Sequence, residues 1–214
     1  MRNDLLSGLI LTLIGSAAAM AAVPPAEDWR IGPLIRGKNY SQGMPLTPQP
    51  TKTGWSFNFP YPNVTAGHVH YVTFNHGSLT GKSKIVVRYR VDGAPGVRFV
   101  PQEHQQAPAT FSAYFQRRGD NWSGRRGYEF YRWYAPAQTM QEIRPGEYEY
   151  TLSLNDPKWI SVQGTTAEVN PDEFHKAKAN AGQIGIVFGS GNARGHGVFA
   201  TAPAKFTLLK FDIL

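Results

Sequence analysis

The densest concentration of polar and aromatic side chains lies in residues 115–134, where five arginines and two tryptophans surround a glycine-rich stretch. Arginine supplies planar groups with several donors, and tryptophan supplies a flat apolar face. A sugar needs both, because its CH faces stack on aromatic rings while its hydroxyl or carboxylate groups bind forked donors. We therefore predict a ligand-binding site that comprises Arg118, Asp120, Asn121, Trp122, Arg125, Tyr131, Arg132, Trp133 and, from a second segment, His196.

The alternative for residues 115–134 is a hairpin with core aromatics and solvated arginines. A returning strand over residues 128–134 would place Arg132 and Trp133 on opposite faces. If the Arg132 face is buried, the guanidinium must find a carboxylate. If the Trp133 face is buried, Arg132 lies outside. The sequence leaves both alternatives open.

The second glycine-rich segment spans residues 188–198 and contains His196. Its glycines allow positive φ angles and a close approach of the backbone. No helix is predicted to follow it, which argues against nucleotide binding, because phosphate loops use a helix N-terminus. His196 is expected either to contact a ligand or to have a structural role.

Histidines offer a second kind of chemistry. His68 and His70 lie two residues apart in a predicted strand and hence on one face, so that His76, His104 or His196 could complete a metal site. No carboxylate motif accompanies them, and the chain has no cysteine. We therefore expect neither a metal nor a cofactor.

Enzyme signatures are missing from the sequence: it contains no G-x-S-x-G motif, no H-E-x-x-H motif and no Glu-x-Asp-x-x-Glu strand. A polysaccharide lyase would need Arg, His and Tyr, which Arg132, His196 and Tyr131 supply. We expect a non-catalytic protein, with a glycan-active enzyme of the lyase type as the alternative.

Strands must position these residues. The 214 residues are 13% aromatic and 17% charged, with 22 Gly, 16 Pro and no Cys, which favours one all-β domain and excludes a disulfide framework or a disordered chain. One helix is predicted near residues 171–181, with Asn170 as N-cap and Pro171 at its first position. Alternating patterns predict strands over residues 53–59, 68–75, 84–91, 97–100, 110–117, 128–134, 147–154, 184–188 and 205–213. This spacing predicts an antiparallel β-sandwich of the jelly-roll kind.

Three segments are expected along the chain. Residues 1–22 are typical of a cleaved export signal, with an apolar run over residues 5–14 and Ala19-Met20-Ala21 as an A-x-A pattern. We expect cleavage near residues 21–22, no membrane span afterwards, and a periplasmic or secreted bacterial protein. Residues 23–52 form a proline-rich extended segment, and residues 53–214 form the β-sandwich domain.

The formal net charge of +7 favours an acidic partner. For an exported protein, that partner is an anionic carbohydrate or another cell-envelope polymer rather than nucleic acid. Another envelope protein that meets the arginine-rich and aromatic surface is a further partner to consider.

The strand pattern, the loop over residues 115–134 and the glycine-rich turn over residues 189–197 before a final strand together resemble a galactose-binding-like jelly roll, the scaffold of many carbohydrate-binding modules. The resemblance covers about residues 50–214. It implies a β-sandwich with a ligand site in the loops at one end, and often a structural calcium ion. No acidic calcium-binding loop is visible, so the metal is not carried over. The chain also resembles uncharacterised exported β-sandwich proteins of Gram-negative bacteria, which implies a binding or envelope role.

Three functions follow as hypotheses. The first is an exported carbohydrate-binding protein that favours anionic glycans, the second a secreted lyase-like enzyme, and the third a structural envelope protein. If Trp122, Arg132 and His196 share one concave face, the first two are favoured. If Arg132 and Trp133 are buried and His196 is distant, the third gains ground.

Overall fold

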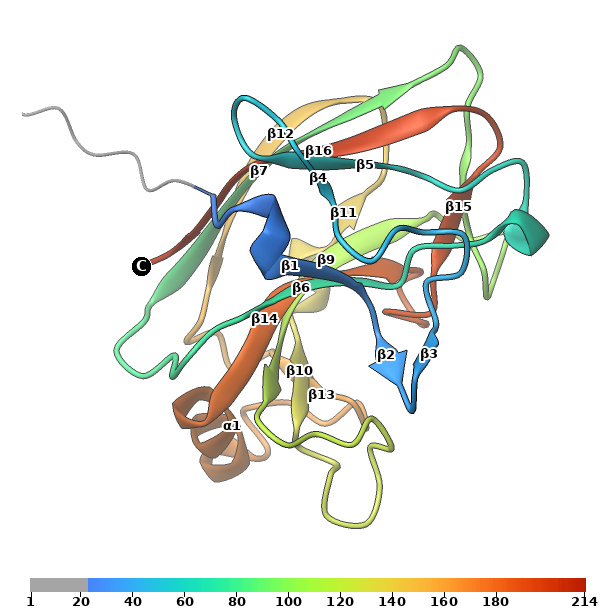
Figure 1. Ribbon diagram of the computed structural model, residues 1–214. Helices are drawn as coiled ribbons and strands as arrows, with labels where there is room; N and C mark the ends of the chain where they lie inside the picture. The colour runs from blue at the N-terminus through green and yellow to red at the C-terminus, as the bar shows by residue number, and fades with distance from the viewer. Residues whose placement is uncertain (1–22) are drawn as a thin grey trace, which may run out of the picture.

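Two antiparallel sheets face each other in the computed structural model, which describes residues 23–214 (Figure 1). The predicted export signal over residues 1–22 lies outside the described residues. The first sheet has the order β1 (Trp29–Gly32), β6 (Tyr71–Asn75), β14 (Ala181–Gly189), β9 (Thr110–Arg117), β10 (Arg132–Tyr134) and β13 (Ile160–Ser161). Strand β11 (Gln141–Glu142) also pairs with β9. The second sheet has the order β12 (Gly146–Ser153), β7 (Lys84–Gly93), β16 (Ala204–Ile213), β5 (Trp55–Asn58) and β4 (Gln49–Pro50).

The connectivity is that of a jelly roll. Strands β5, β16, β7 and β12 lie side by side in one sheet, and β6, β14, β9 and β10 lie side by side in the other. In chain order, β5 is the first of these eight strands and β16 the last, and they are neighbours. The second strand, β6, likewise lies next to the seventh, β14. This order is the double Greek key of a jelly roll, and the predicted all-β sandwich with one short helix is confirmed.

Smaller elements complete the fold. Two short ribbons, β2 (Leu34–Ile35) with β3 (Lys38–Asn39) and β8 (Phe99–Pro101) with β15 (Val198–Ala200), lie outside the two sheets. Single turns of 3-10 helix, η1 (Ala26–Asp28), η2 (Val64–Ala66) and η3 (Ala137–Thr139), occupy connections. None of the helices within residues 23–214 is long and apolar enough to cross a membrane.

Aromatic side chains fill the space between the sheets. Trp29 of β1 meets Trp55 of β5, with ring centroids 4.8 Å apart. Phe206 of β16 contacts Phe111 of β9 at 5.5 Å and stacks on Phe57 at 5.4 Å. Because successive strand residues alternate between faces, every second side chain of each central strand joins this core. Phe111, Ala113 and Phe115 of β9 are examples of this alternation.

Helix α1 (Pro171–Ala179) closes one end of the sandwich. Its Phe174 lies 5.0 Å from the ring of Trp133 and 5.8 Å from that of Phe115. Pro171 occupies the first turn, as predicted, and Asn170 is the N-cap residue but makes no side-chain hydrogen bond there. The predicted helix is confirmed with an end two residues earlier than expected.

Most predicted strands match observed ones, and β9 has the predicted bounds. The strand predicted over residues 128–134 is shorter, because Tyr131 N donates to Tyr128 O and closes a turn before β10 begins at Arg132. The proline-rich segment over residues 23–52 supplies β1 and β4, which are edge strands of the two sheets. This segment therefore pairs with the sandwich strands β6 and β5.

Strand β12 forms the other edge of the second sheet. Its residues Glu147, Tyr148 and Glu149 are exposed. Arg88 of the neighbouring β7 donates from Nε to Glu147 Oε1 at 2.9 Å. The strand thus has one paired side and one side without a neighbouring strand in the described sheet.

Gly185 tests the packing of the first sheet. A Cβ atom on this residue would lie 2.2 Å from the carbonyl oxygen of Val72 on β6. We therefore expect Gly185→Ala to lower the free energy of unfolding by about 1–3 kcal/mol, as overpacking does. Gly77→Ala is the matched control, since nothing lies within 4 Å of its Cβ position. Urea unfolding of both variants measures the difference, and equal stabilities would contradict the packing described here.

Candidate functional site

Four polar side chains form a row across the outer face of the first sheet. The register pairs Asn75 of β6 with Gln183 of β14, Gln183 with Gln116 of β9, and Gln116 with Arg132 of β10. Residues opposite each other in register point to the same face of a sheet. Three amides and a guanidinium are thus aligned across four adjacent strands.

Three tyrosines lie beside this row on the same face. Tyr71, Tyr114 and Tyr134 form a cluster with Val187, and the hydroxyl oxygens of Tyr71 and Tyr134 are 2.8 Å apart. Tyr114 donates from its hydroxyl to Gln116 Oε1 at 3.3 Å. Burial raises the pKa of all three hydroxyls, so they stay neutral.

The loop over residues 118–131 folds back over the tyrosines. Trp122 packs edge-on against Tyr71, with ring centroids 5.2 Å apart. The Arg132 guanidinium carbon lies 4.9 Å from the Trp122 ring centroid, and Arg132 Nη2 donates to Trp122 O at 3.1 Å. Trp122 has a φ angle of 68°, a left-handed conformation that is uncommon outside glycine. Arg132 therefore holds the loop through both the backbone oxygen and the ring of Trp122.

Asp120 completes the anchor of the loop. Its carboxylate is fully buried and lies 3.3 Å from Arg132 Nη1. Gln116 Nε2 donates to Asp120 Oδ2 at 3.0 Å, and Trp122 N donates to Oδ1 at 3.0 Å. Burial raises the pKa of Asp120, while the Arg132 guanidinium opposes that rise. We call Gln116, Asp120, Trp122 and Arg132 the loop anchor.

The two alternatives for β10 are both partly realised. Trp133 faces the core, as the second alternative required, so Arg132 points outward. The folded-back loop nevertheless buries Arg132, and the guanidinium has found the carboxylate that the first alternative demanded. A strand pattern alone gives two faces and contains no information on a loop that covers one of them.

An open cleft of about 620 Å³ lies between the loop anchor and the ends of β6 and β14. Its lining residues are Asn75, His76, Gly77, Gln116, Arg117, Arg118, Gly119, Asp120, Trp122, Gly182 and Gln183. Its carboxylate, Asp120, is engaged by Arg132. The two lining arginines, Arg117 and Arg118, therefore give the cleft a net positive charge.

The amides and arginines of the cleft differ in how they are held. Gln183 Nε2 donates to Asn75 Oδ1 at 3.5 Å, a long bond that leaves other donors and acceptors of both amides free for further contacts. The Arg117 guanidinium carbon sits 4.6 Å above the Tyr131 ring centroid, which fixes its direction. Arg118 is exposed. The cleft thus combines two amides with one oriented and one exposed guanidinium.

Three of the nine predicted residues line the cleft. They are Arg118, Asp120 and Trp122. Asn121 and Arg125 are exposed on the same loop without lining it, and Asn121 Oδ1 accepts from Ser123 N at 2.9 Å. The predicted loop borders the cleft, but these two side chains do not line it.

The other four predicted residues do not line the cleft. Tyr131 packs under Arg117, Arg132 is buried in the loop anchor, and Trp133 is 0% exposed in the core. His196 is exposed and pairs through Nδ1 with Glu103 Oε1 at 2.7 Å, away from the residues that line the cleft. By the criterion set from the sequence, the burial of Arg132 and Trp133 and the position of His196 outside the cleft favour the structural envelope role over the binding site and the enzyme that used these residues.

The sequence prediction missed the amides of the cleft. Asn75 ends a predicted strand, Gln116 is next to last in another, and Gln183 precedes a third. In antiparallel neighbours, the end of one strand lies beside the start of the next. This signal points to the three amides only once the strand order β6-β14-β9 is known.

His68 and His70 form a buried pair. Their rings are 4.6 Å apart, and His70 Nδ1 lies 2.7 Å from Gly195 O, a contact that holds the glycine-rich loop against β6. Burial lowers the pKa of His70 to about 4, and the neighbouring His68 and His196 add to this effect. Within residues 23–214, no three His, Cys, Asp or Glu side chains are grouped to hold a metal ion.

Fold and site together define a jelly-roll β-sandwich with a positively charged, amide-lined cleft on the outer face of one sheet. No protein-family model matches the sequence, and no curated protein matches it.

The loop anchor predicts a strong response to loss of the Asp120 charge. Asp120→Asn keeps the shape but leaves the Arg132 charge buried without its partner, so we expect a loss of about 3 kcal/mol in the free energy of unfolding. The control is Asp92→Asn, which removes an exposed ion pair whose two atoms, Arg90 Nε and Asp92 Oδ2, are 3.2 Å apart. This change should alter the free energy of unfolding by less than about 1 kcal/mol. Chemical denaturation measures both, and similar effects of the two variants would show that the anchor is not an energetic unit.

His70 predicts a stability loss in acid. Its pKa is about 4 in the folded chain against 6.5 for a free histidine, so the unfolded chain binds a proton more tightly. Stability from this residue is complete above pH 6.5 and falls between pH 6.5 and 4. The total loss is roughly 3 kcal/mol. His70→Asn keeps a donor for Gly195 O without the titration and should flatten the slope of stability against pH, as measured by urea unfolding across this range. Equal slopes for both proteins would rule the effect out.

Proposed function

We propose that the protein binds carbohydrate in the cleft at the ends of β6, β9 and β14. The observation that carries the proposal is the pair of amides of Asn75 and Gln183, which lie beside the buried Gln116 in a cleft bordered by Arg118 and Trp122. Amide groups donate and accept at once, which suits vicinal hydroxyls that also do both. The half-buried Trp122 offers an aromatic edge beside them.

We further propose that the preferred ligand carries carboxylates. Arg117 and Arg118 are among the lining residues, while the acidic side chain of the lining is already paired with Arg132. Arg117 is held in place by Tyr131, so its fork of donors is oriented before a ligand arrives. Charge-assisted bonds from guanidinium to carboxylate are stronger than neutral ones. A glycan of uronic acid units satisfies both the amides and the arginines.

A binding role is favoured over lyase chemistry. The three side chains that a lyase would use are each engaged separately, since Arg132 binds Asp120, Tyr131 packs under Arg117, and His196 pairs with Glu103. General acid–base chemistry needs its groups within hydrogen-bond reach of one substrate position. The residues of the cleft are suited instead to hold a ligand.

The wider proposal is an exported carbohydrate-binding protein of the galactose-binding-like kind. The jelly-roll topology supports the likeness in fold. The apolar run and A-x-A pattern in residues 1–22 support export to the periplasm or medium. A carbohydrate or cell-envelope polymer is the partner that this location and the positive cleft favour.

Calorimetric titration tests the proposal with a trimer of galacturonic acid and with galactotriose, its neutral counterpart. We expect the acidic trimer to bind at least about tenfold more tightly, since a hydrogen bond to a charged group contributes about 1.5–3 kcal/mol. Arg118→Ala should reduce this difference, and Gln183→Ala should weaken both ligands about fivefold.

The matched control is Arg125→Ala, which removes an exposed arginine of the same loop that does not line the cleft. It should bind like the unchanged protein. If neither trimer binds, or if Arg118→Ala and Arg125→Ala have the same effect, the cleft is not the binding site. Either result would support the structural envelope role instead.

A further inference from the structure

The ribbon of β2 and β3 projects from the body of the molecule (Figure 1). Leu34 pairs with Asn39 and Ile35 with Lys38, and Tyr40 N donates to Pro33 O at 3.0 Å, which closes the hairpin. The two turn residues, Arg36 and Gly37, both have positive φ angles, 51° and 79°. Positive φ at both central residues is the mark of a type I′ turn.

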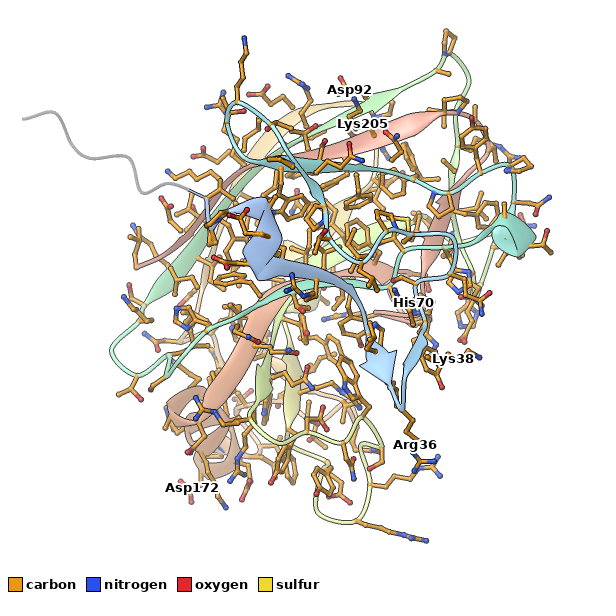
Figure 2. All side chains as sticks on the ribbon, viewed as in Figure 1. Arg36, Lys38, His70, Asp92, Asp172 and Lys205 are labelled. Atoms are coloured by element: carbon orange, nitrogen blue, oxygen red, sulfur yellow. The ribbon has the colours of Figure 1, made fainter. Side chains whose placement is uncertain are left out.

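Arg36 is an unusual residue for this position. A type I′ turn favours Asn before Gly, because Asn tolerates the left-handed region better than a long side chain does. Conformational preference therefore does not account for an arginine at the tip. Figure 2 shows the labelled Arg36 and Lys38 directed away from the body of the protein.

Apolar side chains surround these cations. Leu34 is 53% exposed, Tyr40 is 40% exposed, and Lys38 Nζ lies 5.2 Å from the Tyr40 ring centroid. Leu46 is 57% exposed next to the base of the hairpin, where its carbonyl accepts from Ile31 N at 2.8 Å. The tip thus combines aliphatic, aromatic and cationic side chains.

The charge around the hairpin is one-sided in sequence. Residues 29–91 contain eight Lys or Arg residues and no Asp or Glu. Among the ion pairs of residues 23–214, none involves Arg36 or Lys38. Both cations are exposed and free to meet an anionic surface.

We propose that the β2–β3 hairpin docks the protein on the surface of an anionic phospholipid bilayer. Leu34 and Tyr40 enter the boundary between headgroups and acyl chains, and Arg36 and Lys38 bind lipid phosphates. Basic residues next to apolar and aromatic anchors are the chemistry of interfacial binding.

The distribution of the anchors favours a bilayer over a protein partner. Leu34 shares a face with Asn39, whereas Lys38 and Tyr40 lie on the opposite face, because successive strand residues alternate. A protein surface that contacts one face would leave the other apolar side chain in water. A lipid interface surrounds an inserted tip and covers both faces.

The docking surface is independent of the glycan cleft. The hairpin follows Gly32, which pairs with Tyr71 at one end of β6, while the cleft residue Asn75 lies at the other end of that strand. No hairpin residue lines the cleft. Variants of one site therefore leave the other intact, and each proposal can fail separately.

Vesicle co-sedimentation tests the docking surface. Protein comprising residues 23–214 is mixed with vesicles of phosphatidylcholine alone and with vesicles that also contain phosphatidylglycerol. We expect binding to the anionic vesicles only, weakened by added salt. Arg36→Asn is the sharpest variant, because Asn-Gly is the preferred type I′ pair and the hairpin keeps its fold. It should reduce the partition coefficient about fivefold, as should Lys38→Asn.

Two further variants and a control complete the test. Leu34→Ser and Tyr40→Ser remove the apolar anchors and should each weaken binding at least threefold, by the free energy of burying such groups. Lys205→Asn removes an exposed lysine at the opposite end of the molecule (Figure 2) and should have no effect. Full binding by the Arg36→Asn, Lys38→Asn double variant overturns the proposal. Failure to bind either kind of vesicle also overturns it and is the result expected for an acidic protein partner.

Discussion

The buried ion pair between Asp120 and Arg132 is the interaction on which the outer face of the first sheet depends. It joins a loop to a strand, and it holds Trp122 against the cluster that contains the three tyrosines. Gln116 serves both the pair and the cleft, so the same hydrogen bonds that secure the loop also fix one wall of the cleft. The ion pair beneath the loop over residues 118–131 thus contributes both to the stability of the fold and to the shape of the candidate site.

The jelly roll explains why the amides of the cleft come from distant parts of the sequence. Its connectivity places β6, β14 and β9 side by side although they are separated along the chain. Antiparallel pairing then aligns Asn75, Gln183 and Gln116 at one end of the sheet. The inner face of the same strands is aromatic and apolar, so these strands carry core packing on one side and ligand chemistry on the other.

Much of the fold was predictable because alternation is a local property. The alternating pattern of residues 110–117 predicted the bounds of β9, and the segment that begins at Pro171 predicted the position of α1. Strands as short as β2 or β13 have too few residues to alternate, so the pattern did not indicate them. The loop with Arg118, Asp120 and Trp122 was also predictable from its composition. Burial of Arg132 depends on a loop that folds back, and the amide row depends on strand order, so neither follows from local sequence.

The exposed edge of β12 has a consequence for the behaviour of the protein in concentrated solution. Open strand edges tend to join those of other copies. Two copies of β12 paired about Tyr148 would place Glu147 of one opposite Glu149 of the other, and pairing about Glu149 would bring two copies of that carboxylate face to face. Like charges directly opposite across a strand pair repel. The acidic side chains of this edge therefore oppose self-assembly through this open eight-residue edge strand.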